Sequence, residues 1–542
     1  MHYDGRPASP APGARGWTAW EITLVFASDE GGESGALPVR VQWTRQRAGS
    51  DYPMNTTQVR YQRRRVADLA AALRLARAQI RRDRGPRAEL VRHQQQRLEV
   101  VVRHAATHSP FYRRQFAETG VFAEGPIQLT RLPVLDKSLV MEHFDELVCD
   151  PRLRRDELLD WVGRTTRDQL YLDRYRVMLT SGSSGRPGLF VYDAAGWRSI
   201  GSGLIQSATW KGLRPTLPRQ RMAFVGAAGP AHISRQAALL ATGLHRVLVL
   251  PITLPLPRLV EALNKFQPTY LQAYPSAAMW LADEQHAGRL RVSPRILVTV
   301  AELRTPEMTQ RLQEAFGINP FDLYGSSEGL FGSECEHHQG IHLLEDTTLV
   351  ENVDADGQPV PPGQPGARLL VTNLYNLVQP LLRLEVTDVV TIDPNPCPCG
   401  RILARMKTIY GRSDDVLSLS ARDGGQVAIH PLHFALLTRD PQVGEFQVIQ
   451  DGPLLRVLIV PRHPSTPSRV GNDDGLETGL ERAIAQQLRD LGVQDPQVTV
   501  ERRSELARTS SGKLKLVIAD PTYPDLSAWV VARATTHADK SG

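Results

Sequence analysis

Residues Thr180–Pro187 read T-S-G-S-S-G-R-P and are followed by the apolar run Leu189–Tyr192. Two glycines, four hydroxyl side chains and one guanidinium fall within these eight positions, just before a stretch that predicts a β-strand. Glycine lets the backbone approach an anion, hydroxyls donate hydrogen bonds, and arginine adds charge and a forked donor. This composition predicts a phosphate-binding loop, although a Ser/Gly-rich surface turn has a similar composition.

The loop differs from the Walker loop of P-loop NTPases. That motif requires a lysine followed by serine or threonine, whereas here Arg186 is followed by Pro187. A P-loop kinase is therefore a distant alternative, and the rest of the chain must identify the chemistry.

Length and composition limit the function classes. A chain of 542 residues is too long for one core, so we expect at least two domains. The net charge of +6 is small for this length and gives no sign of a nucleic-acid partner. The apolar run Val247–Pro257 is interrupted by prolines and shorter than the roughly 18 residues of a membrane helix. We expect a cytoplasmic protein without a membrane partner, and a homodimer is left open.

The pattern of the chain divides it into three parts. Residues 1–55 are rich in Gly, Pro, Ser and Arg and are expected to form an N-terminal appendage. Residues 56–412 begin with helical periodicity and then alternate apolar runs with helical stretches, which predicts an α/β domain of multi-stranded sheets with flanking helices. The strands expected there are 177–179, 189–192, 222–225, 247–250, 270–273, 296–300 and 369–372.

Residues 413–542 predict a small α+β domain. Apolar runs on both sides of Asp451-Gly452 indicate a β-hairpin. A helix follows, with one apolar face formed by Leu476, Leu480, Ile484, Leu488 and Leu491.

Four further polar motifs carry chemistry. In Tyr324–Gly329 (Y-G-S-S-E-G), the Glu328 carboxylate lies beside hydroxyls and glycines and is suited to hold Mg²⁺, although a plain turn is the alternative. The segment Arg383–Asp388 (R-L-E-V-T-D) ends in a carboxylate that can accept hydrogen bonds from ribose. The remaining motifs are Gly411–Asp415 (G-R-S-D-D), at the predicted domain boundary, and Arg508–Lys513 (R-T-S-S-G-K), a loop with an ammonium.

The five motifs occur in the order, and at about the spacing, of the adenylate-forming superfamily of acyl ligases, which the chain resembles from about Leu90 to its C-terminus. Within this superfamily it most resembles the phenylacetate–coenzyme A ligase branch. The residues that carry this closer likeness are His108–Tyr112 (H-S-P-F-Y), Gln267–Thr269 (Q-P-T), Pro275-Ser276 and Cys397–Arg401 (C-P-C-G-R). The resemblance implies a large adenylation domain followed by a small, mobile C-terminal domain.

The resemblance also implies a role for each matching residue. Glu328 would bind Mg²⁺, Asp414 would be the hinge, and Lys513 would swing in to stabilise the adenylation transition state. The residues implied to bind ATP phosphates are Thr180, Ser181, Gly182, Ser183, Ser184, Gly185 and Arg186, with Arg186 also catalytic. Those implied to surround adenine and ribose are Ala301, Glu302, Tyr324, Gly325, Ser327, Asp388 and Arg412. By position, Phe224, Ala227, Tyr274 and Ser276 are candidates for the acid pocket.

This assignment agrees with the chemistry. Displacing pyrophosphate with a carboxylate brings several negative charges together, so catalysis rests on positioning and on neutralisation by Mg²⁺, Arg and Lys. Two departures from the family pattern bear on how these residue roles apply to this chain. Arg186 stands where the family commonly has lysine, and Leu417–Gly425 does not match the glycine-bearing segment of coenzyme A ligases.

The cysteines form a separate candidate site. Cys335, His342, Cys397 and Cys399 offer three thiolates and one imidazole, an acceptable tetrahedral set for structural zinc. The branch includes members with cysteines at matching places. Reduced thiols without metal are the alternative, and His337 or His338 can replace His342 in the set.

The leading hypothesis is an ATP-dependent, AMP-forming ligase. It would activate a carboxylic acid, aromatic in one interpretation, and pass the acyl group to coenzyme A or to an amine. Nitrite or an oxygen nucleophile is an alternative acceptor. A nucleotide-binding or carrier-docking homologue without turnover is the alternative from another class, although Lys513, Glu328 and Asp388 are all present.

Overall fold

A computed structural model describes residues 20–26, 39–45, 56–122, 125–180, 188–438, 440–462, 475–509 and 511–519. Most of residues 1–55, predicted to form an N-terminal appendage, lie outside these ranges. What is described there is an antiparallel pair, β1 (Trp20–Phe26) and β2 (Val39–Arg45). The predicted phosphate-binding residues Ser181, Gly182, Ser183, Ser184, Gly185 and Arg186 also lie outside the described residues.

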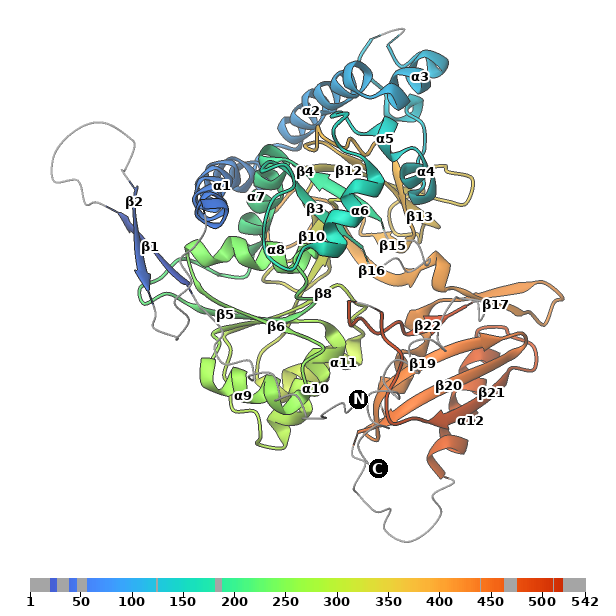
Figure 1. Cartoon of the computed structure of the whole chain (residues 1–542). Helices are drawn as coiled ribbons and strands as arrows, with labels where there is room; N and C mark the ends of the chain where they lie inside the picture. Colours follow the sequence, from blue (N-terminus) through green and yellow to red (C-terminus); the bar gives the residue numbers. More distant parts are fainter. Residues whose placement is uncertain are drawn as a thin grey trace, which may run out of the picture.

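Helices form the first part of the described chain (Figure 1). A break between two helices falls at Ser109-Pro110, because a residue before proline avoids the helical conformation, and Ser109 has extended φ and ψ. Ser109 then accepts a hydrogen bond from the Tyr112 backbone and starts the next helix. These helices are α1 (Thr56–Arg82), α2 (Arg87–His108), α3 (Pro110–Thr119), η1 (Leu129–Arg131), α4 (Lys137–Glu142), α5 (Phe144–Leu147) and α6 (Arg155–Arg164).

A mixed sheet organises the large part of the molecule. Its strands β6, β5, β7, β8 and β9 are parallel to one another. The pairs β9–β10, β10–β11, β11–β16 and β16–β15 are antiparallel. The order is β15 (Asp388–Ile392), β16 (Arg405–Arg412), β11 (Ile341–Leu343), β10 (Phe331–Glu334), β9 (Phe321–Gly325), β8 (Ile296–Val300), β7 (Tyr270–Ala273), β5 (Arg221–Gly226) and β6 (Arg246–Pro251). The carboxyl ends of the parallel strands meet at one edge, where such sheets bind ligands.

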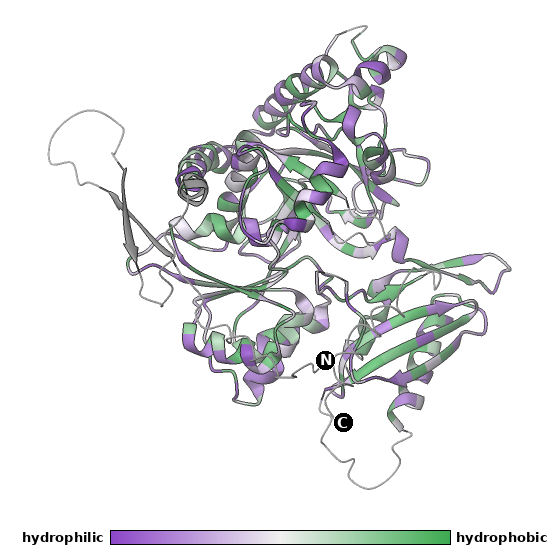
Figure 2. Ribbon diagram, viewed as in Figure 1, coloured by the Kyte–Doolittle hydropathy of each residue, from purple (hydrophilic) through white to green (hydrophobic). Residues whose placement is uncertain are grey.

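Helices cover both faces of the parallel strands (Figure 1). On one side lie α9 (Leu256–Phe266), α10 (Pro275–His286) and α11 (Pro306–Phe316). On the other side lie α7 (Ala194–Trp210), α8 (Ile233–Leu240) and the short η2 (Ala241–Gly243). Figure 2 shows apolar residues concentrated on the strands between these layers.

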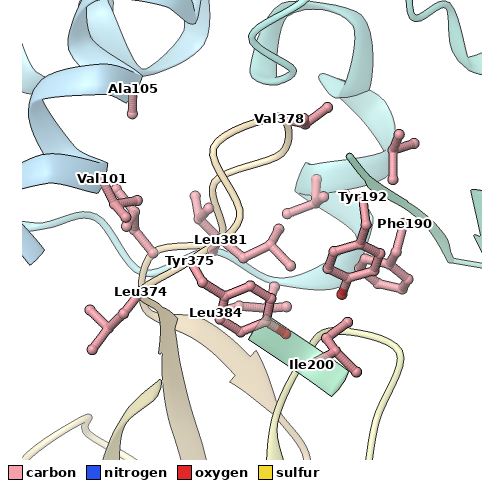
Figure 3. Close-up of a cluster of buried hydrophobic side chains, with 14 of the residues drawn as sticks. Val101, Ala105, Phe190, Tyr192, Ile200, Leu374, Tyr375, Val378, Leu381 and Leu384 are labelled. Carbon is pink, nitrogen blue, oxygen red and sulfur yellow. The ribbon is translucent and has the colours of Figure 1, made fainter. Parts of the chain in front are cut away.

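Two smaller sheets flank the mixed sheet. They are β3 (Arg176–Leu179) with β4 (Leu189–Tyr192), and β12 (Thr348–Val353), β13 (Arg368–Asn373) and β14 (Leu384–Val386). Figure 3 shows side chains from α2, β4, α7 and the segment after β13 meeting in one cluster. Tyr192 and Tyr375 stack there, with ring centroids 6.3 Å apart.

Residues 413–519 form a separate core beside the large part (Figure 1). After η3 (Ser413–Asp415) come the hairpin β17 (Leu417–Ser420) and β18 (Gln426–Ile429), and η4 (Pro431–Thr438). A sheet of order β21 (Gln497–Arg502), β20 (Leu454–Pro461), β19 (Val443–Asp451) and β22 (Val517–Ile518) then packs against α12 (Gly475–Asp490).

The predicted α/β architecture is confirmed. Every strand expected from sequence is present, as β3, β4, β5, β6, β7, β8 and β13, and so is the hairpin at Asp451-Gly452. One detail was wrong: α12 ends at Asp490, so Leu491 lies beyond the helix and is 36% exposed instead of on its buried face. No helix among the described residues combines the length and apolar character that crossing a membrane requires.

The core of residues 413–519 predicts a strong effect of one substitution. Ile484 of α12 is 1% exposed within that core. Ile484→Ala leaves a cavity and should lower the free energy of opening α12 by about 2–5 kcal/mol. Amide hydrogen exchange of α12 peptides measures this change. Arg482→Ala, at an exposed position of the same helix, should leave exchange nearly unchanged, and equal exchange in both variants would contradict the packing described.

Candidate functional site

The described residues enclose a cavity of about 950 Å³ between the large part and residues 413–519. It lies at the carboxyl ends of β7, β8 and β9, so the loops after these strands form its wall. Residues predicted from sequence that line it are Thr180, Tyr274, Ala301, Glu302, Tyr324, Gly325, Ser327, Glu328, Asp388, Arg412 and Lys513. The structure therefore brings together residues spread over more than 300 positions.

Thr180 and Gly188 close the neck of the Ser/Gly-rich loop. The Thr180 backbone N–H donates to the Gly188 carbonyl at 2.9 Å, and the Gly188 N–H donates to Thr180 Oγ1 at 2.8 Å. Lys137 lies over this neck and donates to Thr180 Oγ1 at 2.9 Å. A Cβ on Gly188 would lie 2.3 Å from Lys137 Cε, so glycine makes room for the lysine.

The Glu328 loop is fixed by the stacked core tyrosines. Tyr192 donates to the Ser327 carbonyl at 2.6 Å, and Tyr375 donates to the Gly329 carbonyl at 3.3 Å. Gly329 has φ +94°, and a Cβ there would lie 2.4 Å from the Tyr375 hydroxyl, so only glycine fits. The Glu328 carboxylate lies 3.7 Å from Lys137 Nζ, which places a cation and an anion together at the cavity wall.

Asp388 and Arg412 are direct partners in the antiparallel pair β15–β16. Tyr324, at the end of β9, donates its hydroxyl to Asp388 Oδ2. Burial and the Asp388 charge raise the pKa of Tyr324 well above its usual value, so the phenol stays a neutral donor. Burial disfavours the charged Arg412, but Asp388, Asp415 and Glu328 more than compensate and raise its pKa.

Lys513 belongs to residues 413–519 and lines the cavity from a tight turn. Thr509 closes this turn by accepting from the Lys513 N–H at 3.1 Å and donating its own N–H to the Lys513 carbonyl at 2.9 Å. The ammonium lies 5.9 Å from the centre of the Tyr274 ring. Burial, with Arg412 nearby, lowers the pKa of Lys513 to about 8, although Glu302, Glu328 and Asp388 oppose the shift.

The four acid-pocket candidates occupy different environments. Tyr274 lines the cavity, and its hydroxyl accepts from the Ala227 backbone N–H at 3.1 Å. Phe224 packs against the Tyr270 ring at 5.8 Å, and Ser276 is hydrogen-bonded to Glu302. Phe224, Ala227 and Ser276 are not among the described residues that line the cavity. Apolar residues that line the cavity include Leu204, Ile233, Ala237 and Val300.

The four predicted metal ligands also meet in space. The ligand atoms of Cys335, His342, Cys397 and Cys399 all lie within 4.8 Å of one another, and all four residues are buried. Cys335 Sγ and Cys397 Sγ are 3.7 Å apart, and Cys399 Sγ is 3.4 Å from His342 Nε2. His342 Nδ1 lies 3.3 Å from the Leu403 carbonyl, which leaves Nε2 directed at the thiols. This set can hold a metal ion.

Two residues that line the cavity, and one beside it, received no role from the sequence. Lys137 begins α4 and His232 precedes α8, both at positions that read locally as ordinary helix starts. His232 lines the cavity, and burial, followed by the charge of Lys513, lowers its pKa. Arg508 was quoted as part of the lysine loop but given no role, and only the tertiary fold shows its contacts.

Comparison with known proteins agrees with the site. The model of the family described as AMP-binding enzyme matches residues 93–373, just over half of the chain. The phenylacetate-coenzyme A ligase of Thermus thermophilus is 28% identical over 466 residues, covering 80% of this chain and 97% of that protein. The phenylacetate-coenzyme A ligase of Pseudomonas putida is 28% identical over 345 residues, covering 60% of this chain and 72% of that protein.

A solved structure shows the same fold. The 2-hydroxyisobutyryl-CoA ligase in its postadenylation state, in complex with 2-HIB-AMP, superposes with a TM-score of 0.65 at 23% identity, over 84% of this chain and 94% of that chain. The family model, the curated relatives and this fold confirm the resemblance inferred from the motifs. The chain belongs to the AMP-binding enzyme family, within the phenylacetate–coenzyme A ligase-like branch of the adenylate-forming superfamily.

Proposed function

We propose that this protein activates a carboxylic acid with ATP, releases pyrophosphate, and transfers the acyl group from the resulting acyl-adenylate to the thiol of coenzyme A. The observation that carries the proposal is the convergence of Thr180, Glu328, the Asp388–Arg412 pair and Lys513 on one cavity. Phosphate-binding, ribose-binding and charge-neutralising groups thus surround a single space, as adenylation requires.

In this proposal an oxygen of the acid attacks the α-phosphorus of ATP. The new bond joins that oxygen to phosphorus, and the bond to the bridging oxygen breaks with its electron pair leaving on pyrophosphate. Lys513 would neutralise the charge that develops there, and Asp388 and Arg412 would hold the ribose. Glu328 would hold Mg²⁺, whose charge would offset that of the phosphates.

The second step needs a nucleophile at the acyl carbon. A coenzyme A thiol would form the thioester and release AMP, in keeping with the relatives described above. The chain departs from the family pattern at Leu417–Gly425, which the structure shows as the β17–β18 hairpin. An amine or nitrite acceptor is therefore tested alongside coenzyme A, and a protein that only binds nucleotide is the remaining alternative.

The cysteine cluster supports a structural zinc ion. A tetrahedral site with Zn–S bonds of about 2.3 Å places sulfurs about 3.8 Å apart, close to the 3.7 Å between Cys335 and Cys397. A disulfide would need about 2.05 Å instead. Zinc bound here would join β10 and β11 to the Cys397–Cys399 segment between β15 and β16, and would brace the cavity without taking part in the reaction.

Removing the ammonium tests the reaction directly. Pyrophosphate release is measured with ATP, a panel of aromatic and aliphatic acids, and coenzyme A, amines or nitrite. The parent should respond to at least one acid, and Lys513→Ala should lower that rate by about 10²-fold or more, as expected for loss of a preorganised charge. Lys265→Ala, at an exposed position of α9 outside the cavity, is the matched control. No acid-dependent release by the folded parent would contradict the proposal.

The pKa of Lys513 predicts a pH dependence. A burial-lowered pKa of about 8 means that the ammonium is present below this pH and lost above it. The kcat/KM for ATP, which reports the free enzyme, should therefore decline as pH rises through about 8. Lys513→Arg keeps its charge over this range, so any activity it retains should lack the decline. The assignment fails if the two profiles have the same alkaline limb.

Metal analysis tests the zinc proposal. The purified parent should hold about one zinc ion per chain, and Cys397→Ser should lose it and unfold at a lower temperature. Cys149→Ser is the matched control, because Cys149 lies outside the cluster and should keep the metal. Equal zinc content in both variants would rule out the site.

A further inference from the structure

The turn that carries Lys513 is attached on both sides to the same two residues of the large part. After the lysine, the Leu514 N–H donates to Glu302 Oε1 at 2.8 Å. Before the turn, Arg508 Nη1 donates to Ser276 Oγ at 3.1 Å. Ser276 and Glu302 therefore receive both flanks of the turn, and we call these two residues the Ser276–Glu302 pair.

The pair is itself a connected unit. The Ser276 backbone N–H donates to Glu302 Oε2 at 2.9 Å, and Ser276 Oγ lies 3.2 Å from Glu302 Oε1. Ser276 lies in the first turn of α10 and Glu302 follows β8, so both belong to elements of the parallel sheet layer. Burial raises the pKa of Glu302, but its hydrogen bonds and Arg508 favour the carboxylate, as expected for a group that accepts several donors.

Arg508 is held by more than Ser276. Its guanidinium stacks on the Trp280 ring, 4.4 Å from the ring centre, and forms an ion pair with Glu445. Trp280 Nε1 also donates to Glu445 at 2.8 Å. Ser276 and Trp280 belong to α10, whereas Glu445 belongs to β19, so this cluster joins the two parts of the chain.

Backbone hydrogen bonds and close packing restrain the described residues of the turn between these attachments. Thr509 bonds to both Lys513 and Gly512 through the backbone. Gly512 has φ +81°, and a Cβ there would lie 2.3 Å from Ile252 Cγ2, so the turn packs closely against the large part. Fixing the two ends of such a turn fixes the direction of Lys513.

We propose that Glu302 and Ser276 are positioning residues for Lys513, which hold its ammonium in the cavity during adenylation and have no part in the later acyl transfer. This inference rests on the proposed function. It gives Ser276 a role at the contact between the two parts of the chain instead of in the acid pocket, and gives the Glu302 side chain a role beyond lining the nucleotide site.

Separate measurement of the two half-reactions tests this role. In Glu302→Ala, Leu514 and Ser276 lose their acceptor, so Lys513 is no longer directed at the phosphates. Acid-dependent pyrophosphate release should fall by about 10²-fold, the usual cost of misplacing a catalytic group by about 1 Å. Transfer from chemically synthesised acyl-adenylate to the acceptor should fall far less, because Lys513 is not needed there, so the ratio of the two rates should change. Ser276→Ala keeps its backbone N–H and should give a smaller loss in the first half-reaction.

A second interface contact supplies the control. Arg462 also crosses between the two parts and donates to Asp283 at 2.8 Å, away from the lysine turn. Arg462→Gln should leave the ratio of the two half-reactions as in the parent. An equal loss of both half-reactions in Glu302→Ala, or no loss in either, would overturn the inference.

A readout without turnover separates this claim from the proposed function. Amide hydrogen exchange of the peptide containing Leu514 should be slow in the parent and in Arg462→Gln, and fast in Glu302→Ala. If no acid supports pyrophosphate release, the proposed function fails, while this exchange still decides whether Glu302 holds the turn. Equal exchange in Glu302→Ala and Arg462→Gln would show that it does not.

Discussion

The site depends on one buried ammonium, which residues 413–519 place against groups of the large part. Lys513 lies in a cavity where burial and Arg412 disfavour its charge, and the carboxylates of Glu302, Glu328 and Asp388 favour it. Each carboxylate comes from a different segment: the loop after β8, the loop after β9, and β15. The arrangement therefore exists only when the sheet is complete and residues 413–519 are docked against it. A substrate triphosphate would add negative charge at this point and favour the protonated lysine further.

The rigidity of the site comes from polar contacts between the core and the loops. Tyr192 and Tyr375 stack in the hydrophobic cluster of Figure 3 and direct their hydroxyls to the carbonyls of Ser327 and Gly329. Lys137 bridges the neck at Thr180 to Glu328. Tyr324, at the end of β9, fixes Asp388 by a hydrogen bond. The groups that we propose to meet phosphates and ribose are thus held before a ligand arrives, which is the main source of catalytic power in charge-neutralising sites.

Much of the fold and part of the site could be predicted from the sequence. The parallel strands are continuous apolar runs between helical stretches, so β5, β7 and β8 stand out. The short antiparallel strands β10, β11 and β14 do not, because three or four residues give too little periodicity. Motif residues such as Asp388 and Arg412 were found because the family pattern names them. Lys137 and the bond from Leu514 to Glu302 were missed, since no local signal reveals a partner from a distant segment.

The central claim is that the acid becomes an acyl-adenylate, and the fate of oxygen tests it most directly. With an acid that supports turnover, labelled with ¹⁸O in its carboxylate, attack on the α-phosphorus followed by attack of the acceptor on the acyl carbon leaves one labelled oxygen on AMP. Mass spectrometry of the released AMP should therefore show the label, while pyrophosphate stays unlabelled. Unlabelled AMP, or label in inorganic phosphate or pyrophosphate, would contradict the account and point to attack at another phosphorus.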